Sequence, residues 1–104
     1  MATYVVLANW TQQGIEHVRE SPERTARGKA FAKSLGAEIK AFYLLMGQYD
    51  TMWIVEAPDD ETMAKVCLAI GSQGSVSTMT LRAWTEAEYK KICKAIPKKT
   101  STAS

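Results

Sequence analysis

The chain is poor in the side chains that most metal and redox sites use. Among its 104 residues it has one histidine, His17, and two cysteines, Cys67 and Cys93. The cysteines fall in helical patterns without the spacing of paired metal ligands, and with a single histidine they cannot complete an ordinary zinc site. We interpret them as buried, reduced thiols of a cytoplasmic protein, with a disulfide or a redox pair as the alternative. We predict neither a metal nor another cofactor.

Long apolar runs and a strong charge of one sign are also absent. No window approaches the roughly 20 apolar residues that a membrane-spanning helix needs. The first residues pass directly into a strand pattern, without the basic and apolar regions of a signal peptide. The formal net charge is +2, and Lys98 and Lys99 near the C-terminus account for that excess. We therefore predict a cytoplasmic protein whose partners include neither nucleic acid nor membranes.

The patterns that are present predict one small domain over residues 1–96, followed by a disordered tail over 97–104. Apolar and β-branched runs predict strands at 3–9, 39–46, 51–57 and 76–84. With a helix after the first strand and another after the third, the order is βαββαβ plus a C-terminal helix. This order is that of an α+β, ferredoxin-like sandwich with strand order 4-1-3-2, antiparallel neighbours and both helices on one face.

The helices carry signals at their ends. Ser21 is expected as the N-cap, with Pro22 at the first helical position, of a helix that stops at Gly36. Acidic residues at 59–61 open the next helix, and Thr85 with Glu88 forms a capping box for the last one. The expected inward-facing residues are Met63, Val66, Cys67 and Ile70 on the second helix, and Tyr89, Ile92, Cys93 and Ile96 on the third.

Gly47 and Gln48 separate two of the strands and predict a type II′ hairpin, because glycine supplies the positive φ that this turn requires. The turn would pair Met46 with Tyr49. One face of the hairpin would then hold the pairs Leu44–Thr51, Phe42–Trp53 and Lys40–Val55. The other would hold Leu45–Asp50, Tyr43–Met52, Ala41–Ile54 and Ile39–Glu56. Both faces are largely apolar or aromatic, which indicates that both are covered.

The chain's own helices can cover only one face of such a sheet. A second copy of the same sheet is the economical cover for the other face, since twofold dimers are the commonest oligomers. We therefore predict that the partner is a second copy of this chain, in a homodimer or larger homo-oligomer. Two sheets packed face to face would make a dimeric α/β barrel.

Several blocks of residues resemble a known family. They are Gly47-Gln48-Tyr49-Asp50, then residues 54–61 (Ile-Val-Glu-Ala-Pro-Asp-Asp-Glu) and 80–84 (Thr-Leu-Arg-Ala-Trp), with Gly14-Ile15 and Phe42-Tyr43 before the hairpin. Over residues 3 to 95 the chain resembles the GYD domain family. The resemblance implies a small bacterial or archaeal protein of the dimeric α/β barrel superfamily. That family has no settled function, so no catalytic residues are carried over.

In this fold a set of polar and aromatic residues would gather at one end of the sheet. His17 and Asp50 are the candidate catalytic residues, with Asp50 holding His17 as a general base. The alternative is that Asp50 caps turn amides and His17 is solvated. The candidate ligand-binding residues are Asn9 and Tyr49 as hydrogen-bonding groups and Trp10 and Trp53 as walls. For Tyr49 the alternative is packing over the hairpin or at the dimer contact.

Other residues have simpler interpretations. Trp10, Tyr43, Trp53 and Trp84 are expected in core and interface packing, with cofactor stacking as the alternative. Arg82 would lie inside a strand, where an unpaired charge is costly. We therefore predict a structural or inter-subunit ion pair, with Glu56 as the partner, rather than anion binding.

These features leave two functions open. The first is the binding of a small, aromatic or otherwise apolar molecule at the rim or between sheet and helices, with cofactor-independent acid/base or oxygenation chemistry as an extension. The second is a non-catalytic assembly or regulatory module in which the aromatic residues form an interface. A cavity of at least about 300 Å³ with His17 facing it would favour the first.

Overall fold

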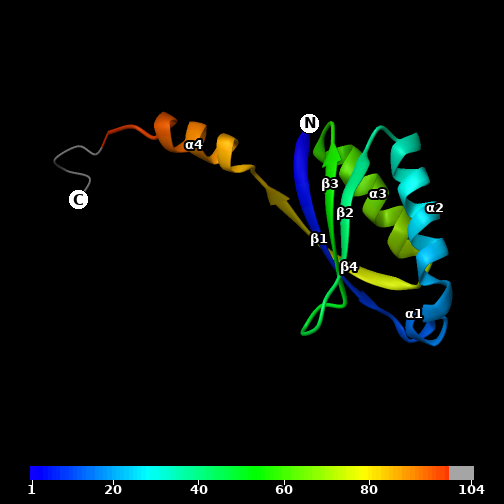
Figure 1. Ribbon diagram of the computed structural model, residues 1–104. Helices are drawn as coiled ribbons and strands as arrows, with labels where there is room; N and C mark the ends of the chain where they lie inside the picture. The colour runs from blue at the N-terminus through cyan, green and yellow to red at the C-terminus, as the bar shows by residue number, and fades with distance from the viewer. Residues whose placement is uncertain (99–104) are drawn as a thin grey trace.

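A computed structural model describes residues 1–98 of the chain. Its sheet consists of β1 (Ala2–Trp10), β2 (Glu38–Leu44), β3 (Thr51–Ala57) and β4 (Val76–Ala83) in the order β2-β3-β1-β4, with antiparallel neighbours. Helices α2 (Ser21–Ser34) and α3 (Asp60–Ser72) lie together on one side of this sheet (Figure 1). The predicted ferredoxin-like fold and its strand order are confirmed, while the pairing of two such sheets into a barrel stays a prediction.

The connection between β1 and α2 differs in detail from the expectation. It contains the short helix α1 (Gln12–Glu16) and a 3₁₀ turn, η1 (Val18–Glu20). The N-cap of α2 is Glu20, which makes no side-chain capping bond, so Ser21 is the first helical residue and not the cap. The helix ends as predicted, because Gly36 adopts a φ of +87°, which an L side chain rarely tolerates.

The other helix starts follow the sequence signals. Asp59 accepts a hydrogen bond from the Thr62 N–H at 2.8 Å and caps α3. In α4 (Glu86–Ala95), the Glu88 N–H donates to Thr85 Oγ1 at 3.2 Å, and the Thr85 N–H donates to Glu88 Oε1 at 2.8 Å. The predicted capping box is therefore present, and its hydrogen bonds hold the pKa of Glu88 below the ordinary value.

The hydrophobic core lies between the sheet and the helices α2 and α3. Alternate residues of β1 and β3 point into it, as the period of a strand requires. Its buried members are Tyr4, Val6, Ala8, Ala32, Ala37, Trp53, Val55, Ala57, Met63 and Val66. Cys67 and Ile70 are half-buried beside this cluster, which completes the predicted inward stripe of α3.

The β2–β3 hairpin has the predicted register only near its middle. The pairs from Leu44–Thr51 to Ala41–Ile54 are formed, but an irregularity between Ile39 and Ala41 shifts the rest, so Ile39 pairs with Val55 instead of Glu56. The extra residue of this β-bulge is Lys40, and its predicted pairing with Val55 is wrong.

The hairpin loop is also wider than a two-residue turn. The Asp50 N–H donates to Ala8 O of β1 at 2.9 Å, while the Asp50 carbonyl accepts from the Leu45 N–H at 2.8 Å. In a regular strand both groups of a residue face the same neighbour, so the β3 ladder stops before Asp50 and the predicted Met46–Tyr49 pair does not form. Gly47 keeps the expected positive φ, at +135°.

The last helix, α4, stands apart from the sheet and from the other helices, beyond the end of β4 (Figure 1). Its apolar residues Tyr89, Ile92 and Ile96 are 59%, 46% and 63% exposed, and Cys93 is exposed too. The prediction that these four residues face inward is therefore wrong for the single chain, because within residues 1–98 no other helix or strand packs against α4. The two thiols, both predicted to be buried, therefore differ in exposure. Cys93 is exposed, whereas Cys67 is half-buried, and burial raises the pKa of Cys67.

The C-terminal end of the described chain has no regular structure at Pro97 and Lys98, and the rest of the predicted tail, 99–104, lies outside the described residues. Within residues 1–98, none of the helices is long and apolar enough to cross a membrane.

Candidate functional site

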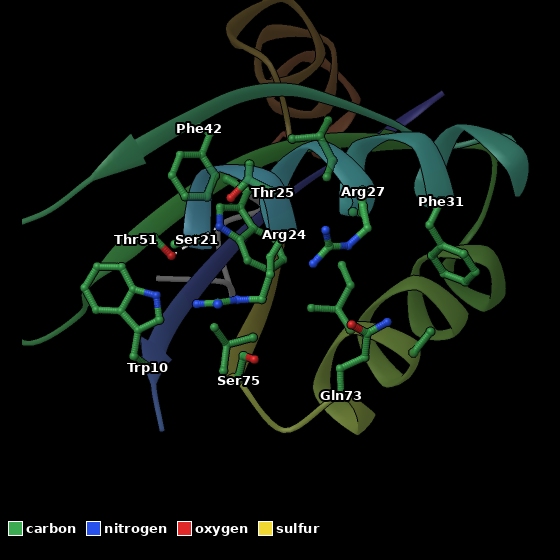
Figure 2. A pocket seen from close by; sticks show the side chains of 16 residues that line it. Trp10, Ser21, Arg24, Thr25, Arg27, Phe31, Phe42, Thr51, Gln73 and Ser75 are labelled. Atoms are coloured by element: carbon green, nitrogen blue, oxygen red, sulfur yellow. Dashed lines mark hydrogen bonds between the residues drawn. The ribbon is translucent and has the colours of Figure 1, made fainter. Parts of the chain in front are cut away.

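A cavity of about 260 Å³ opens between the sheet and the helices α2 and α3 (Figure 2). Its lining comes from every layer of this region: the ends of β1 and β4, the inward side of β2 and β3, and the facing sides of the two helices. The lining residues are Trp10, Ser21, Arg24, Thr25, Arg27, Gly28, Phe31, Ile39, Phe42, Thr51, Trp53, Ala69, Ile70, Gln73, Ser75 and Val76.

Aromatic rings form one wall of this cavity. Phe42 of β2 and Trp53 of β3 occupy a cross-strand pair and stack with their ring centroids 6.3 Å apart and an interplanar angle of 19°. The Trp53 side chain is 7% exposed, and its Nε1–H donates to Thr51 Oγ1 at 3.2 Å. Its one polar atom is therefore satisfied, and the wall presents apolar surface to the cavity.

Two arginines of α2 face the cavity from positions three residues apart, which lie on the same side of a helix. The Arg24 Nη1 donates to His17 O at 2.9 Å, and its Nη2 lies 3.4 Å from Gly14 O, so this side chain also ties α2 to the segment before it. Figure 2 shows Arg24 directed toward Trp10 and Arg27 directed toward the middle of the cavity.

A shallower groove of about 290 Å³ adjoins the cavity on the solvent side. Gln13, His17, Glu20, Arg24, Arg27 and Ser75 line it. The arginines and Ser75 belong to both hollows, so they mark the boundary between them. His17 lines this outer groove and not the cavity, and its Nδ1 lies 3.0 Å from Gln13 O.

Asp50 and Asn9 connect the hairpin loop to the end of β1. The Trp10 N–H donates to Asp50 Oδ2 at 2.9 Å, and the Asp50 N–H approaches Asn9 Oδ1 at 3.1 Å. Among the hydrogen bonds of residues 1–98, none joins Asp50 to His17. The Asp50 carboxylate therefore accepts from a backbone amide, but this amide belongs to the last residue of β1 and not, as the alternative interpretation expected, to the turn. The catalytic role of the pair stays a prediction.

The start of α1 fits closely against the segment that precedes β4. The Thr11 N–H donates to Ser75 O at 3.0 Å, and the Thr11 hydroxyl donates to Gly74 O at 2.5 Å. A Cβ on Gly14 would collide with the backbone oxygen of Ser75, so only glycine fits there. This contact holds the segment that supplies Ser75 to the cavity wall.

The sequence prediction found two of the cavity residues, Trp10 and Trp53, and missed the arginines. The signal that could have indicated them is the spacing of Arg24 and Arg27 on the helix that follows the predicted N-terminus at Ser21. Phe42 was predicted as the cross-strand partner of Trp53, and that pairing is confirmed.

The opposite side of the sheet, which we call the open face, is not covered by any helix within residues 1–98 (Figure 1). Its central residues are Val5, Leu7, Ala41, Tyr43, Met52, Ile54, Met79 and Leu81, all apolar or aromatic. Met79 and Leu81 are 48% and 44% exposed. The Tyr49 hydroxyl lies 3.5 Å from Met79 Sδ, so Tyr49 borders the open face and not the cavity.

The β1 register shows that Arg82 and Glu56 cannot form the predicted ion pair within one chain. Arg82 lies opposite Tyr4, on the helix side of the sheet, whereas Glu56 lies opposite Thr3 on the open face. The Arg82 guanidinium stacks over the rings of Tyr4 and Trp84, at 5.5 Å and 4.5 Å from their centroids, and its Nη1 donates to Thr3 O at 3.1 Å. Its charge is thus compensated by aromatic rings and a carbonyl group.

Tyr4 forms a second polar contact at this end of the core. Its hydroxyl donates to Asp60 at the start of α3, and burial, reinforced by Asp60, raises the pKa of Tyr4 to about 12. The contact joins β1 to α3, so its role is structural. No group of three His, Cys, Asp or Glu side chains within residues 1–98 is arranged to hold a metal ion.

Comparisons with known proteins agree with this fold. The family model of the GYD domain matches residues 4–93. A protein of Thermus thermophilus named "Glutamine synthetase and cystathionine beta-lyase binding protein" is 38% identical over 84 residues, which are 80% of this chain and 88% of that protein. A crystal structure of a Thermus thermophilus protein superposes with a TM-score of 0.54 at 24% identity, covering 82% of this chain and 95% of the other, and supports the fold. The chain belongs to the GYD domain family.

Proposed function

We propose that this chain is a non-catalytic binding module that forms a homodimer and binds other proteins. The observation that carries the proposal is the apolar surface that residues 1–98 leave uncovered, on the open face and on α4. Monomeric proteins rarely expose contiguous apolar patches of more than a few hundred Å², and such patches mark protein interfaces. The name of the Thermus relative, which describes it as binding two enzymes, supports the same class of function.

A second copy is the occupant that fits the open face. The central residues of that face carry no charge, and the two ends are polar, with Thr3 and Glu56 at one end and Asn9 and Ser77 at the other. An apolar centre with a polar rim is the usual composition of an interface. A twofold axis through the open face would bring the same apolar residues of both copies together and close the barrel.

The dimer is tested by the mass of the protein in solution, measured by light scattering during gel filtration. The wild-type chain should have twice the monomer mass of 11.5 kDa. Leu81→Glu places a carboxylate among the apolar residues of the open face, on the edge strand β4, and should give a folded monomer. Leu68→Glu is the matched control, because Leu68 is exposed on α3, away from the open face. A monomeric wild-type protein at tens of micromolar, or equal masses for the two variants, would contradict the proposed dimer.

The binding of other proteins is a separate step of the proposal. By extension from the Thermus relative, the first candidates are glutamine synthetase and cystathionine beta-lyase of the organism that encodes this chain. Purified enzymes immobilised on a sensor surface should retain the wild-type protein. Trp84→Ala, which removes an exposed ring beside α4, tests whether this end of the molecule contributes. If neither enzyme is retained at about 100 µM, a concentration that still detects weak complexes, these two partners are excluded.

Small-molecule binding is the second candidate function, and the cavity between α2, α3 and the sheet favours it. Its volume of about 260 Å³ is below the roughly 300 Å³ of typical ligand pockets, so a ligand would be small. Acid/base catalysis by His17 and Asp50 is a less supported extension, because each side chain has its own backbone partner. His17→Ala should leave the melting temperature unchanged, and a loss of ligand turnover in that variant would revive a catalytic role.

A further inference from the structure

We infer that the cavity between α2, α3 and the sheet binds a small organic carboxylate with a planar, apolar body. This inference rests on the small-molecule candidate above and specifies its chemistry. Of the 16 lining residues, only Arg24 and Arg27 are charged, and both are positive. No carboxylate lines the cavity, and Glu20 lines only the outer groove, so the potential inside the cavity favours an anion.

The two arginines have different roles. Arg24 already donates to the carbonyl group of His17, which fixes the position of its guanidinium. Arg27 has no hydrogen bond or ion pair to any of residues 1–98, and its guanidinium is directed toward the middle of the cavity (Figure 2). The planar fork of an arginine matches the two oxygens of a carboxylate. Arg27 is therefore the direct contact, and Arg24 adds a fixed positive charge beside it.

The inner part of the cavity favours an apolar body attached to that carboxylate. Phe42 and Trp53 form a flat aromatic wall there, and Ile39, Ile70 and Val76 complete the apolar lining. The Trp53 Nε1–H is already bonded to Thr51. A sugar or other polar body placed against this aromatic wall would therefore lose hydrogen bonds to water without replacement.

The volume sets the size of the ligand. One water molecule occupies about 30 Å³ of the liquid, so about 260 Å³ corresponds to roughly nine waters, or an organic molecule of roughly ten non-hydrogen atoms. An arylalkyl carboxylate such as 3-phenylpropionate has this size. Inorganic phosphate carries the charge without the apolar body, and the amide of 3-phenylpropionate carries the body without the charge.

The experiment titrates the isotopically labelled full chain with these three probes and follows the backbone and Trp indole amide signals by NMR. 3-Phenylpropionate should bind saturably below about 10 mM, with shifts at Trp10, Trp53 and the start of α2. The amide should bind roughly tenfold more weakly, because it lacks the charge-assisted bond to arginine. Phosphate should give no saturable shift in the cavity.

Two variants with the same loss of charge locate the anion contact. Arg27→Gln should weaken the binding of 3-phenylpropionate by roughly tenfold or more. Lys29→Gln is the matched control, since Lys29 is exposed on α2 and lines neither hollow, and it should bind like the wild type. The amide spectra of both variants show whether they are folded. Equal affinities for the two variants overturn the inference.

The other outcomes separate this inference from the broader small-molecule candidate. If the amide binds as tightly as the carboxylate and Phe42→Ala abolishes both, the cavity binds apolar molecules, and the carboxylate inference fails alone. If phosphate binds as tightly as the carboxylate, the site recognises negative charge alone and does not require an apolar body, so the inference is wrong. If no probe binds, both the inference and the small-molecule candidate fail. The dimer test with Leu81→Glu is independent of all three.

Discussion

Along β3, Trp53 and Val55 point toward α2 and α3, while Met52 and Ile54 point to the opposite side of the same sheet. The two sides of the sheet are similar in composition, because these consecutive residues of β3 point alternately to opposite sides and are all apolar. They differ in what lies against them: two helices close one side, and nothing from residues 1–98 closes the other. The comparison shows that an apolar strand face predicts burial but does not identify the molecule that buries it.

The largest difference in the free energy of unfolding is expected between alanine substitutions of two methionines that lie on opposite sides of the sheet. Met63 of α3 is 2% exposed in the core, and Met63→Ala should lower the free energy of unfolding by about 2–5 kcal/mol. Met79→Ala on the open face should lower it by less than about 1 kcal/mol in the monomeric Leu81→Glu background. Urea unfolding measures both. Equal losses in that background would mean that the open face is packed within the single chain.

A smaller loss is expected where the hairpin loop is attached to β1. Asp50→Ala removes the acceptor of the Trp10 N–H and should lower the free energy of unfolding by about 1–3 kcal/mol. Asp50→Asn keeps a side-chain oxygen at this position and should recover most of the loss. If the alanine variant has the stability of the wild type, Asp50 is not a structural residue, and its catalytic role gains support.

The contact between Tyr4 and Asp60 should appear in the alkaline limb of the stability curve. The pKa of Tyr4 is raised from 10.0 to about 12, so the folded state favours the neutral phenol. This stability is fully present below pH 10 and is lost as the pH rises toward 12. Urea unfolding of wild type and Tyr4→Phe between about pH 8 and pH 11.5 should show the difference shrinking at the alkaline end. A constant difference would contradict the assigned pKa.

The smallest effect on the whole domain should come from the capping box of α4. Thr85→Ala removes one of its bonds and should destabilise that helix locally by about 0.5–2 kcal/mol. In the Leu81→Glu background, amide exchange should accelerate at residues 86–95 while the urea midpoint of the sheet stays constant. A shift of that midpoint would show that α4 is coupled to the core. In the wild-type background the same mutation should also weaken the dimer, if α4 contributes to it.

Local signals predicted most of the fold, because they depend on neighbouring residues. The glycine at position 36, the cap at Asp59 and the capping box at Thr85 each satisfy orphan backbone groups within one turn, so the sequence indicates them directly. The bulge at Lys40 and the wide loop at Asp50 were missed. The wide loop depends on the hydrogen bonds between Asp50 and β1, a strand far earlier in the chain.

The candidate sites were only half predictable for the same reason. Trp10 and Trp53 could be identified as walls, but the convergence of Arg24 and Arg27 on them depends on how α2 packs against the sheet. The direction of Tyr89 and Ile92 was predicted wrongly, because an apolar helix stripe indicates that a partner is needed and not whether it belongs to the same chain.

The sequence by itself determined the order of the main elements, the end of α2, the starts of α3 and α4, the apolar character of both sheet faces and the family resemblance, because each depends on short-range patterns. The tertiary structure alone decided which face the helices cover, where α4 extends, that Asp50 binds the backbone of Trp10, and that two arginines meet an aromatic wall. Those features require contacts between residues far apart in the chain, and such contacts arise only when the whole core has formed.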